Sequence, residues 1–234
     1  MRRYYFALCF FIGQSIFAGP DTRKFSEMAW SKIAPIYQAI RVHPFNQKLE
    51  DGTLSHERFL FYSTQDSMYL TAFGKALAIL ATRLDERQDI KNVFNEAISS
   101  WNEEKQEQDK TAKQGVAMAP ATRLYTDFLL TTAAYKSREE LVASLLPCFW
   151  IYSRLATELK SRVRRNNPYF DWVSLYSSGK YKKSVDRMIA LADDLASKVS
   201  SEQRAKMIEA FVLASRMEWY FWEASYNMEH WKPE

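Results

Sequence analysis

Apolar residues recur at helical spacing along almost the whole of this 234-residue chain. Apolar positions three and four residues apart share one face of an α-helix, whereas a half-buried strand needs alternation. No stretch shows sustained alternation, and six glycines and seven prolines are few for the turns that sheets need. The pattern therefore predicts an all-α helical bundle, with a core drawn from the 47% of residues that are hydrophobic.

Prolines, glycines and asparagines divide this pattern into seven or eight expected helices. Pro44 should stop the first helix, because the residue before a proline avoids the helical region. The expected helices cover residues 25–42, 55–83, 88–109, 121–135, 138–164, 169–176, 180–199 and 202–226. No repeat, low-complexity tract or linker interrupts them. One helical domain should therefore span residues 19–234.

The first eighteen residues have the layout of a secretory signal peptide. Arg2 and Arg3 give a positive start, an apolar run covers residues 4–12, and small residues near Ala18 offer a cleavage site. The apolar run is shorter than the ~20 residues of a spanning helix, so we expect no stable membrane insertion. We expect cleavage near Ala18 and export to the periplasm or the medium, with an uncleaved anchor as the alternative. The mature chain would then hold one cysteine, Cys148, and no intramolecular disulfide.

Charge and histidine spacing argue against several classes of partner and cofactor. The net charge is only +4 over the whole chain, whereas nucleic-acid-binding domains usually concentrate basic residues on one face. We therefore expect no nucleic-acid partner. The three histidines, His43, His56 and His230, form no His-x-x-x-His or Glu-x-x-His pair, so the sequence predicts neither a metal site nor another cofactor.

Cys148 lies beside Pro147 in a long apolar segment and one helical turn before Tyr152. One buried stripe is expected from the residues at helical spacing, which are Leu141, Leu145, Cys148, Tyr152, Leu155 and Leu159. The proline removes one backbone hydrogen bond and should bend the helix next to the thiol. Free cysteine is commonly a buried core residue, so this segment alone fits either a core thiol or a nucleophile.

Two carboxylic acids fall within aromatic stripes. Asp66 shares a helical face with Tyr62 and Tyr69, and Glu218 is followed by four consecutive aromatic residues. A carboxyl group among apolar neighbours must find a partner or shift its pKa upward, which makes it a proton donor near neutrality. The alternatives are that Asp66 lies at the exposed edge of its stripe and that Glu218 is a paired structural acid. One thiol and two acids suggest a nucleophile, a binding group and a general acid.

At these residues the chain resembles the TenA/thiaminase II family, whose fold is the haem-oxygenase-like helical bundle. Residues 43–45 with 51–54 resemble the family's opening motif, and residues 65–70 resemble its second motif. Residues 146–152 resemble the segment that holds the catalytic cysteine, and residues 218–226 resemble the C-terminal motif. The resemblance extends from Phe25 to Trp231, and Cys148 places the chain with the cysteine-containing branch.

The resemblance implies hydrolysis of thiamin, or of its aminomethylpyrimidine breakdown products, to hydroxymethylpyrimidine. Cys148 would add to the pyrimidine ring, Glu218 would protonate a ring nitrogen, and Asp66 would hold the amino edge. The family's aromatic substrate-binding positions correspond to Tyr69, Tyr125, Tyr152 and Tyr176, with Tyr176 as the stacking wall. The resemblance also implies a homotetramer. Two other functions remain open: a thiamin- or pyrimidine-binding protein without turnover, and a cofactor-poor oxidase of the same fold, which Cys148 disfavours.

Overall fold

The computed structural model describes residues 23–84, 88–113 and 115–233, and within them it contains nine α-helices and no strand. The prediction of an all-α fold is confirmed. In chain order the helices are α1 (Phe25–Arg41), α2 (Pro44–Asp51), α3 (His56–Arg83), α4 (Gln88–Thr111), α5 (Pro120–Tyr135), α6 (Arg138–Leu159), α7 (Phe170–Tyr176), α8 (Gly179–Ser197) and α9 (Ser201–Asn227).

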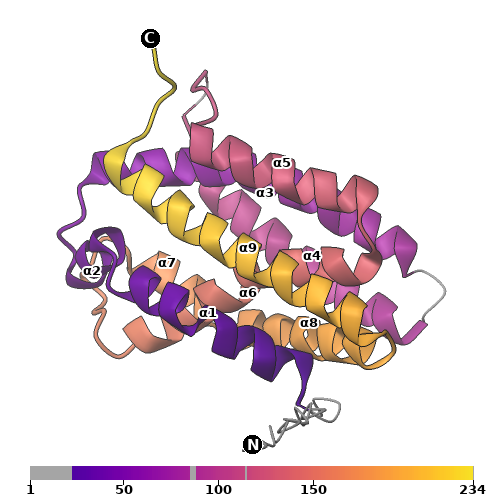
Figure 1. The fold of residues 1–234 in the computed structure, drawn as a ribbon. Coiled ribbons are helices and arrows are strands. Elements are labelled where there is room, and N and C mark those ends of the chain that lie inside the picture. Colours follow the sequence, from indigo (N-terminus) through magenta and orange to yellow (C-terminus); the bar gives the residue numbers. More distant parts are fainter. Residues whose placement is uncertain (1–22, 85–87, 114, 234) are drawn as a thin grey trace, which may run out of the picture.

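Helix α6 forms the centre of the bundle. It packs against α9, α8, α5, α7 and α3, and its residues from Leu141 to Phe149 are all buried. A helix that is surrounded by other helices is apolar on every side, which explains the long apolar segment in the sequence. In Figure 1, α9 crosses the front of the bundle with α5 and α3 on one side and α1 and α8 on the other. The expected stripe along α6 is buried throughout.

Serine caps fix where several of these helices begin. Ser137 opens α6 with a capping box: its hydroxyl accepts a hydrogen bond from the Glu140 N–H at 3.1 Å, and the Glu140 carboxylate accepts one from the Ser137 N–H at 3.3 Å. These contacts satisfy two of the backbone donors that a helix start leaves free. Ser55, Ser178 and Ser200 cap α3, α8 and α9 in the simpler way. The caps set the register of the helices, and with it the direction of each side chain toward the core.

The structure corrects two of the predicted boundaries. Pro44 follows the first helix, as expected, but it also begins a second one. It occupies the first turn of α2, where a missing N–H costs no hydrogen bond and the fixed φ of proline is already helical. The His43 ring caps this helix by accepting a hydrogen bond from the Phe45 N–H at 3.2 Å. The expected count of seven or eight helices was therefore too low, because none was expected over residues 44–51. Helix α6 ends at Leu159 rather than at Arg164, and turns follow it.

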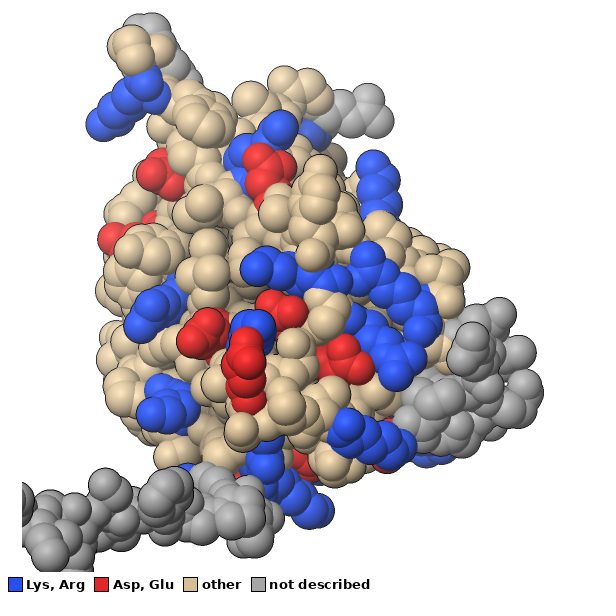
Figure 2. Space-filling model, turned by 45° about the vertical axis from the view of Figure 1, so that its right-hand side comes forward, with Lys and Arg blue, Asp and Glu red and all other residues tan. Residues whose placement is uncertain are grey.

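Residues 1–18, the predicted signal peptide, lie outside the described residues. Among the helices of the described residues, none combines the length and the apolar character needed to cross a bilayer. Figure 2 shows lysine and arginine side chains interspersed with aspartate and glutamate on the face in view. Charged side chains thus lie mainly at the surface, and the few buried carboxylic acids are exceptions to this pattern.

Candidate active site

The seven residues predicted for the site come together in the interior of the bundle, although they lie on five different helices. Each has at most 3% of its surface exposed. Helix α3 supplies Asp66 and Tyr69, and the others are Tyr125 on α5, Cys148 and Tyr152 on α6, Tyr176 on α7 and Glu218 on α9. The alternative that placed Asp66 at an exposed edge is wrong, because its side chain is buried.

Aromatic side chains link these residues into a continuous network. Successive ring centroids lie 5.1–6.3 Å apart around a closed series of contacts. We call the closed series of contacts the aromatic circuit; its members are Tyr69, Phe73, Phe149, Tyr181, Tyr176, Tyr152, Trp222, Tyr62 and Phe221. Flat rings at such spacing form rigid walls of the kind that hold a planar ligand.

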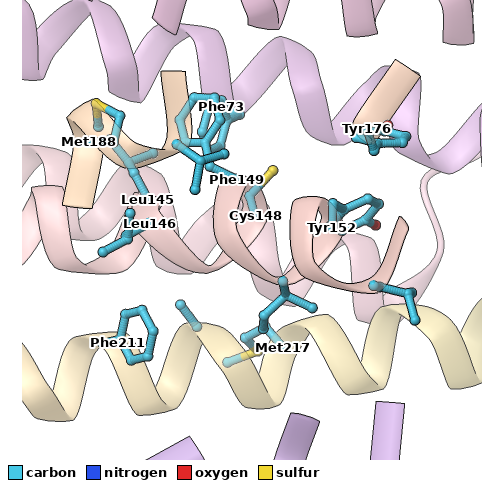
Figure 3. Close-up of a cluster of buried hydrophobic side chains, with 14 of the residues drawn as sticks. Phe73, Leu145, Leu146, Cys148, Phe149, Tyr152, Tyr176, Met188, Phe211 and Met217 are labelled. Carbon is cyan, nitrogen blue, oxygen red and sulfur yellow. The ribbon is translucent and has the colours of Figure 1, made fainter. Parts of the chain in front are cut away.

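Cys148 lies on α6 immediately before Phe149 and one turn before Tyr152, which are both members of the circuit. It is the only cysteine among the described residues, it forms no disulfide there, and it is buried. In Figure 3 its sulfur points away from α9, which carries Phe211 and Met217, and toward the side of α6 where Phe73 and Tyr176 lie. Pro147 lies immediately before it inside α6.

Asp66 is held by a relay of two hydrogen bonds. The Tyr62 hydroxyl donates to its Oδ2 at 3.3 Å, and the Trp172 indole N–H donates to the Tyr62 oxygen at 3.2 Å. Burial raises the pKa of Asp66 from its ordinary value near 3.8 to about 7, although the Tyr62 hydrogen bond and the Lys105 ammonium group lower it. At neutral pH this carboxyl group can therefore change its charge at little cost.

Glu218 accepts a hydrogen bond from the Tyr125 hydroxyl at 2.8 Å. Burial raises the pKa of Glu218 from near 4.5 to about 8; the Tyr125 hydrogen bond lowers it, and the nearby Asp66 raises it further. The group consequently holds its proton near neutrality and is able to act as a general acid.

A third buried acid, Glu104 on α4, lies in the same interior and is 2% exposed. Its Oε1 accepts a hydrogen bond from the Tyr176 hydroxyl at 2.8 Å, and its Oε2 accepts a longer one from the Tyr181 hydroxyl at 3.5 Å. Burial raises the pKa of Glu104 well above its ordinary value, and Asp66 raises it further. No motif in the sequence points to this residue.

The thiol of Cys148 has a pKa raised well above its ordinary value, first by burial and then by the charges of Glu104, Glu218 and Asp66. The Tyr69 hydroxyl lowers this pKa, because it can donate a hydrogen bond to the sulfur once the thiol ionises. Burial and the neighbouring carboxylates therefore favour a protonated thiol at neutral pH. A nucleophilic role for Cys148 requires that the thiol proton leave as the new bond forms, or that a positive charge enter the site.

Two buried hydrogen-bond donors of the aromatic circuit lack partners within the described part of the protein. They are the Tyr69 hydroxyl and the Trp222 indole N–H. A buried polar group without a partner costs free energy, and native structures usually retain one only where a ligand or water completes it. Both donors belong to rings that contact other site residues, Tyr69 to Tyr125 at 4.6 Å and Trp222 to Tyr152 at 5.2 Å. The arrangement suits a planar ligand with hydrogen-bond acceptors on its edge.

Comparison with known proteins gives the family. The family model described as TENA/THI-4/PQQC matches residues 30–228. The chain belongs to the TENA/THI-4/PQQC family. Within this family it is 30% identical over 217 residues to a protein of Bacillus subtilis named "Aminopyrimidine aminohydrolase", a match that covers 89% of this chain and 92% of that one. A protein of Halalkalibacterium halodurans with the same name is 29% identical, with 88% of this chain and 97% of the relative covered.

Solved structures of TenA proteins share the fold. A TenA homologue from Pyrococcus furiosus superimposes with a TM-score of 0.80 at 20% identity, over 86% of this chain and 99% of the other. A TenA homologue from Pyrococcus horikoshii gives a TM-score of 0.75 at 26% identity, over 88% and 99% of the two chains. The prediction of a TenA-type bundle is therefore confirmed.

Glu104 is the site residue of this TENA/THI-4/PQQC chain that sequence reasoning missed. Its segment, residues 102–110, is so rich in charged and amide side chains that it resembles a fully solvated helix. A signal was nevertheless present. Ala97, Trp101, Glu104 and Gln108 recur at three- and four-residue spacing, so Glu104 and Gln108 continue the face that the apolar residues begin. Both are buried in the structure.

One surface hollow of this chain lies apart from the predicted site. It has a volume of about 1370 Å³ and is lined by the last turns of α9, the start of α5 and residues 228–233. The Trp231 indole N–H closes one part of it by donating to the Met118 carbonyl at 2.8 Å. None of the predicted catalytic or substrate-binding residues lines this hollow.

Proposed function

We propose that this chain is an aminopyrimidine aminohydrolase of the thiaminase II type, which acts in thiamin salvage. Two relatives with that name match nearly the whole chain at about the same length. The observation that carries the proposal is the buried constellation itself: one thiol and one acid protonated at neutral pH, enclosed by aromatic rings and unpartnered donors. An aminopyrimidine is planar, carries ring nitrogens that accept protons, and becomes electrophilic once such a nitrogen is protonated.

The proposed reaction begins with addition of the Cys148 sulfur to the ring carbon beside the one that bears the exocyclic methylene. Glu218 delivers its proton to the adjacent ring nitrogen, and the thiol proton passes to an ionised carboxylate of the site, because an ammonium or thiazolium leaving group needs no further proton. The carbon–nitrogen bond at the methylene then breaks, ammonia or the neutral thiazole departs, and the ring nitrogen returns its proton to Glu218. Water adds to the methylene and releases a proton, and the carbon–sulfur bond breaks as the carboxylate returns its proton to the sulfur. The sum is one water consumed and ammonium, or the thiazole and a proton, released, with covalent and acid catalysis by two residues.

The remaining predicted residues would bind the ring. Asp66, with a pKa near neutrality, would accept hydrogen bonds from the amino edge. Tyr152 and Tyr176, whose ring centroids lie 5.1 Å apart, would form one aromatic wall, and Tyr69 with Tyr125 another.

The test is an assay of the purified protein with thiamin and with aminomethylpyrimidine, in which hydroxymethylpyrimidine is measured as product. Cys148→Ser keeps nearly the same volume but ionises far less readily. We expect this variant to bind either compound with an affinity close to that of the unchanged protein and to lose nearly all turnover. A core cysteine would give the reverse: a lower melting temperature and an unchanged rate per folded molecule. Binding without product from the unchanged protein would instead support a pyrimidine-binding protein.

We further propose that residues 1–18 direct export and that the protein assembles as a homotetramer. The first proposal rests on the positive start, apolar run and small residues near Ala18. N-terminal sequencing of the protein from its native host should give a mature chain that begins near Gly19, and a chain that retains Met1 would refute it. The second rests on the resemblance to the family, and light scattering of the mature protein measures the assembly directly.

A further inference from the structure

Glu104 has no role in the reaction proposed above, and its burial has no structural explanation in its contacts. Among the described residues no lysine, arginine or histidine forms an ion pair with it; its hydrogen-bond partners are the hydroxyls of Tyr176 and Tyr181. A buried acid without a cation is costly, and a neutral amide or an apolar side chain of similar size would be cheaper. Each carboxylate oxygen accepts more than one hydrogen bond, so Glu104 retains acceptor capacity.

The location of Glu104 follows from the two rings that hold it. Tyr181 contacts Phe149, the residue after Cys148, at 6.3 Å, and Tyr176 contacts Tyr152, one turn further along α6, at 5.1 Å between ring centroids. Tyr176 also contacts Trp172 at 4.7 Å, which belongs to the relay that holds Asp66. Glu104 therefore lies beside the part of the site that Cys148 and Asp66 share, whereas Glu218 is held by Tyr125 on α5.

This side corresponds to one part of the proposed substrate. On an aminopyrimidine, the carbon that bears the exocyclic methylene stands between the amino-bearing carbon and the carbon that the thiol would attack. If Asp66 holds the amino group and Cys148 adds to the ring, the methylene and its leaving group face the region between those two residues. Glu104 is the acid of that region.

We propose that Glu104 binds a positively charged leaving group on the exocyclic methylene, and so selects substrates that carry a cation there. The inference rests on the proposed function and extends it to a residue outside the family motifs described above. The two hydroxyls that donate to Glu104 hold its carboxylate in place, and the rings around it provide faces for a cation. Tyr176 contacts Trp172 at 4.7 Å and Tyr181 at 5.2 Å between ring centroids. Aromatic faces next to a carboxylate are a favourable setting for an organic ammonium or thiazolium group.

A metal ion is a poorer match for this acid. No three histidine, cysteine, aspartate or glutamate side chains among the described residues lie close enough together to hold one. The cation that Glu104 receives is thus part of an organic substrate. Its arrival would favour ionisation of Glu104 and would also offset the negative charges that hold the proton on Cys148. The charged substrate itself would then supply the positive charge that the thiol needs in order to ionise.

The same contact distinguishes substrate from product. Aminomethylpyrimidine is a cation at neutral pH, and thiamin carries a permanent positive charge on its thiazolium ring. Hydroxymethylpyrimidine has a neutral hydroxyl at the same position. Glu104 would therefore hold the substrate more tightly than the product, which favours release after hydrolysis.

The test compares dissociation constants for aminomethylpyrimidine, thiamin and hydroxymethylpyrimidine, measured calorimetrically on full-length protein in the Cys148→Ser background so that no turnover occurs. We expect Glu104→Gln to weaken the binding of the two cations, aminomethylpyrimidine and thiamin, at least tenfold. The affinity for hydroxymethylpyrimidine should change by less than twofold. Glu103→Gln is the matched control, because Glu103 is the preceding residue on α4 and points outward to Lys180. It should leave all three constants unchanged.

A second measurement needs no substitution at Glu104. In the same background, the preference for aminomethylpyrimidine over hydroxymethylpyrimidine should disappear as the pH rises through the pKa of the free amine, while the preference for thiamin persists. Other titratable groups also face or adjoin this region, namely Asp66, Glu218, Lys105, Tyr176 and Tyr181. Their titration would change the dissociation constants of aminomethylpyrimidine and hydroxymethylpyrimidine together. Equal losses for charged and neutral ligands in Glu104→Gln, or a preference that does not follow the charge of the ligand, would overturn the inference. Binding of the cations without hydrolysis by the unchanged protein would refute only the proposed reaction.

Discussion

Replacing Glu218 by glutamine should stabilise the protein at neutral pH and leave it nearly unchanged in acid. Glu218 has a pKa of about 8 in the folded protein, against an ordinary value near 4.5. Below pH 4 the group is protonated in both the folded and the unfolded chain, so it contributes no pH-dependent difference. As the pH rises from 4.5 toward 8, the unfolded chain ionises while the folded chain keeps its proton. The free energy of unfolding therefore falls over this window.

The size of the effect follows from the same two values. A carboxyl group with this displacement lowers the free energy of unfolding by roughly 3 kcal/mol at pH 7. In a protein of this length, 1 kcal/mol corresponds to about 2–4 °C in melting temperature. Glutamine does not titrate, and its amide oxygen can still accept the hydrogen bond that Tyr125 donates at 2.8 Å. The variant should therefore melt about 6–12 °C higher than the unchanged protein at pH 7.

The assay is thermal unfolding followed by circular dichroism at several pH values between 4 and 8. Glu209→Gln, an exposed substitution on the same helix, serves as the control and should not alter the pH dependence. A difference in melting temperature between Glu218→Gln and the unchanged protein that stays constant over this range would refute the reasoning. So would a variant that becomes less stable as the pH rises.

Two further substitutions test the geometry around the site. Asp66→Asn removes a charge but keeps the size of a buried side chain. Aminopyrimidine binding, measured by titration calorimetry, should weaken about tenfold or more, while the melting temperature at pH 7 should not fall. In Gly74→Ala the new Cβ would lie 2.3 Å from a ring carbon of Trp101, which should push α4 away from α3 and cost about 1–3 kcal/mol of unfolding free energy in chemical denaturation. Gly179→Ala, whose Cβ would meet nothing within 4 Å, should be nearly neutral.

The fold and most of the site could be predicted because their signals are local. Helical spacing of apolar residues is visible within each segment, and a single acid such as Asp66 in an aromatic stripe is conspicuous. The resemblance to a family then related the separate motifs to one site. Helix α2 was missed for a different reason: the same residue type, proline, ends one helix and begins another, and only the His43 cap distinguishes the two cases.

Glu104 is harder to predict because the spacing signal in its own segment is weak, and its burial depends mainly on packing. It is flanked by Glu103 and Lys105, which are more exposed, and by further polar residues that make α4 hydrophilic along this stretch. Which face of such a helix turns inward is set by its contacts with α3 and α8. The close approach of Gly74 to Trp101, and the hydrogen bond from the Trp101 indole to the Leu70 carbonyl at 2.8 Å, fix that face. Neither contact can be recognised in the sequence of α4 alone.

The buried acids also explain why activity and stability should respond in opposite directions. A carboxyl group with a pKa raised by burial lowers the stability of the fold at neutral pH, and Asp66, Glu104 and Glu218 all have this property. A chain shaped by stability alone would replace them with amides or apolar residues. Glu218→Gln should consequently raise the melting temperature and, because an amide cannot deliver a proton, lose nearly all turnover. If the acid were only a structural partner for Tyr125, the variant would retain its rate of turnover. The burial of Glu218 would then lower stability without contributing to catalysis.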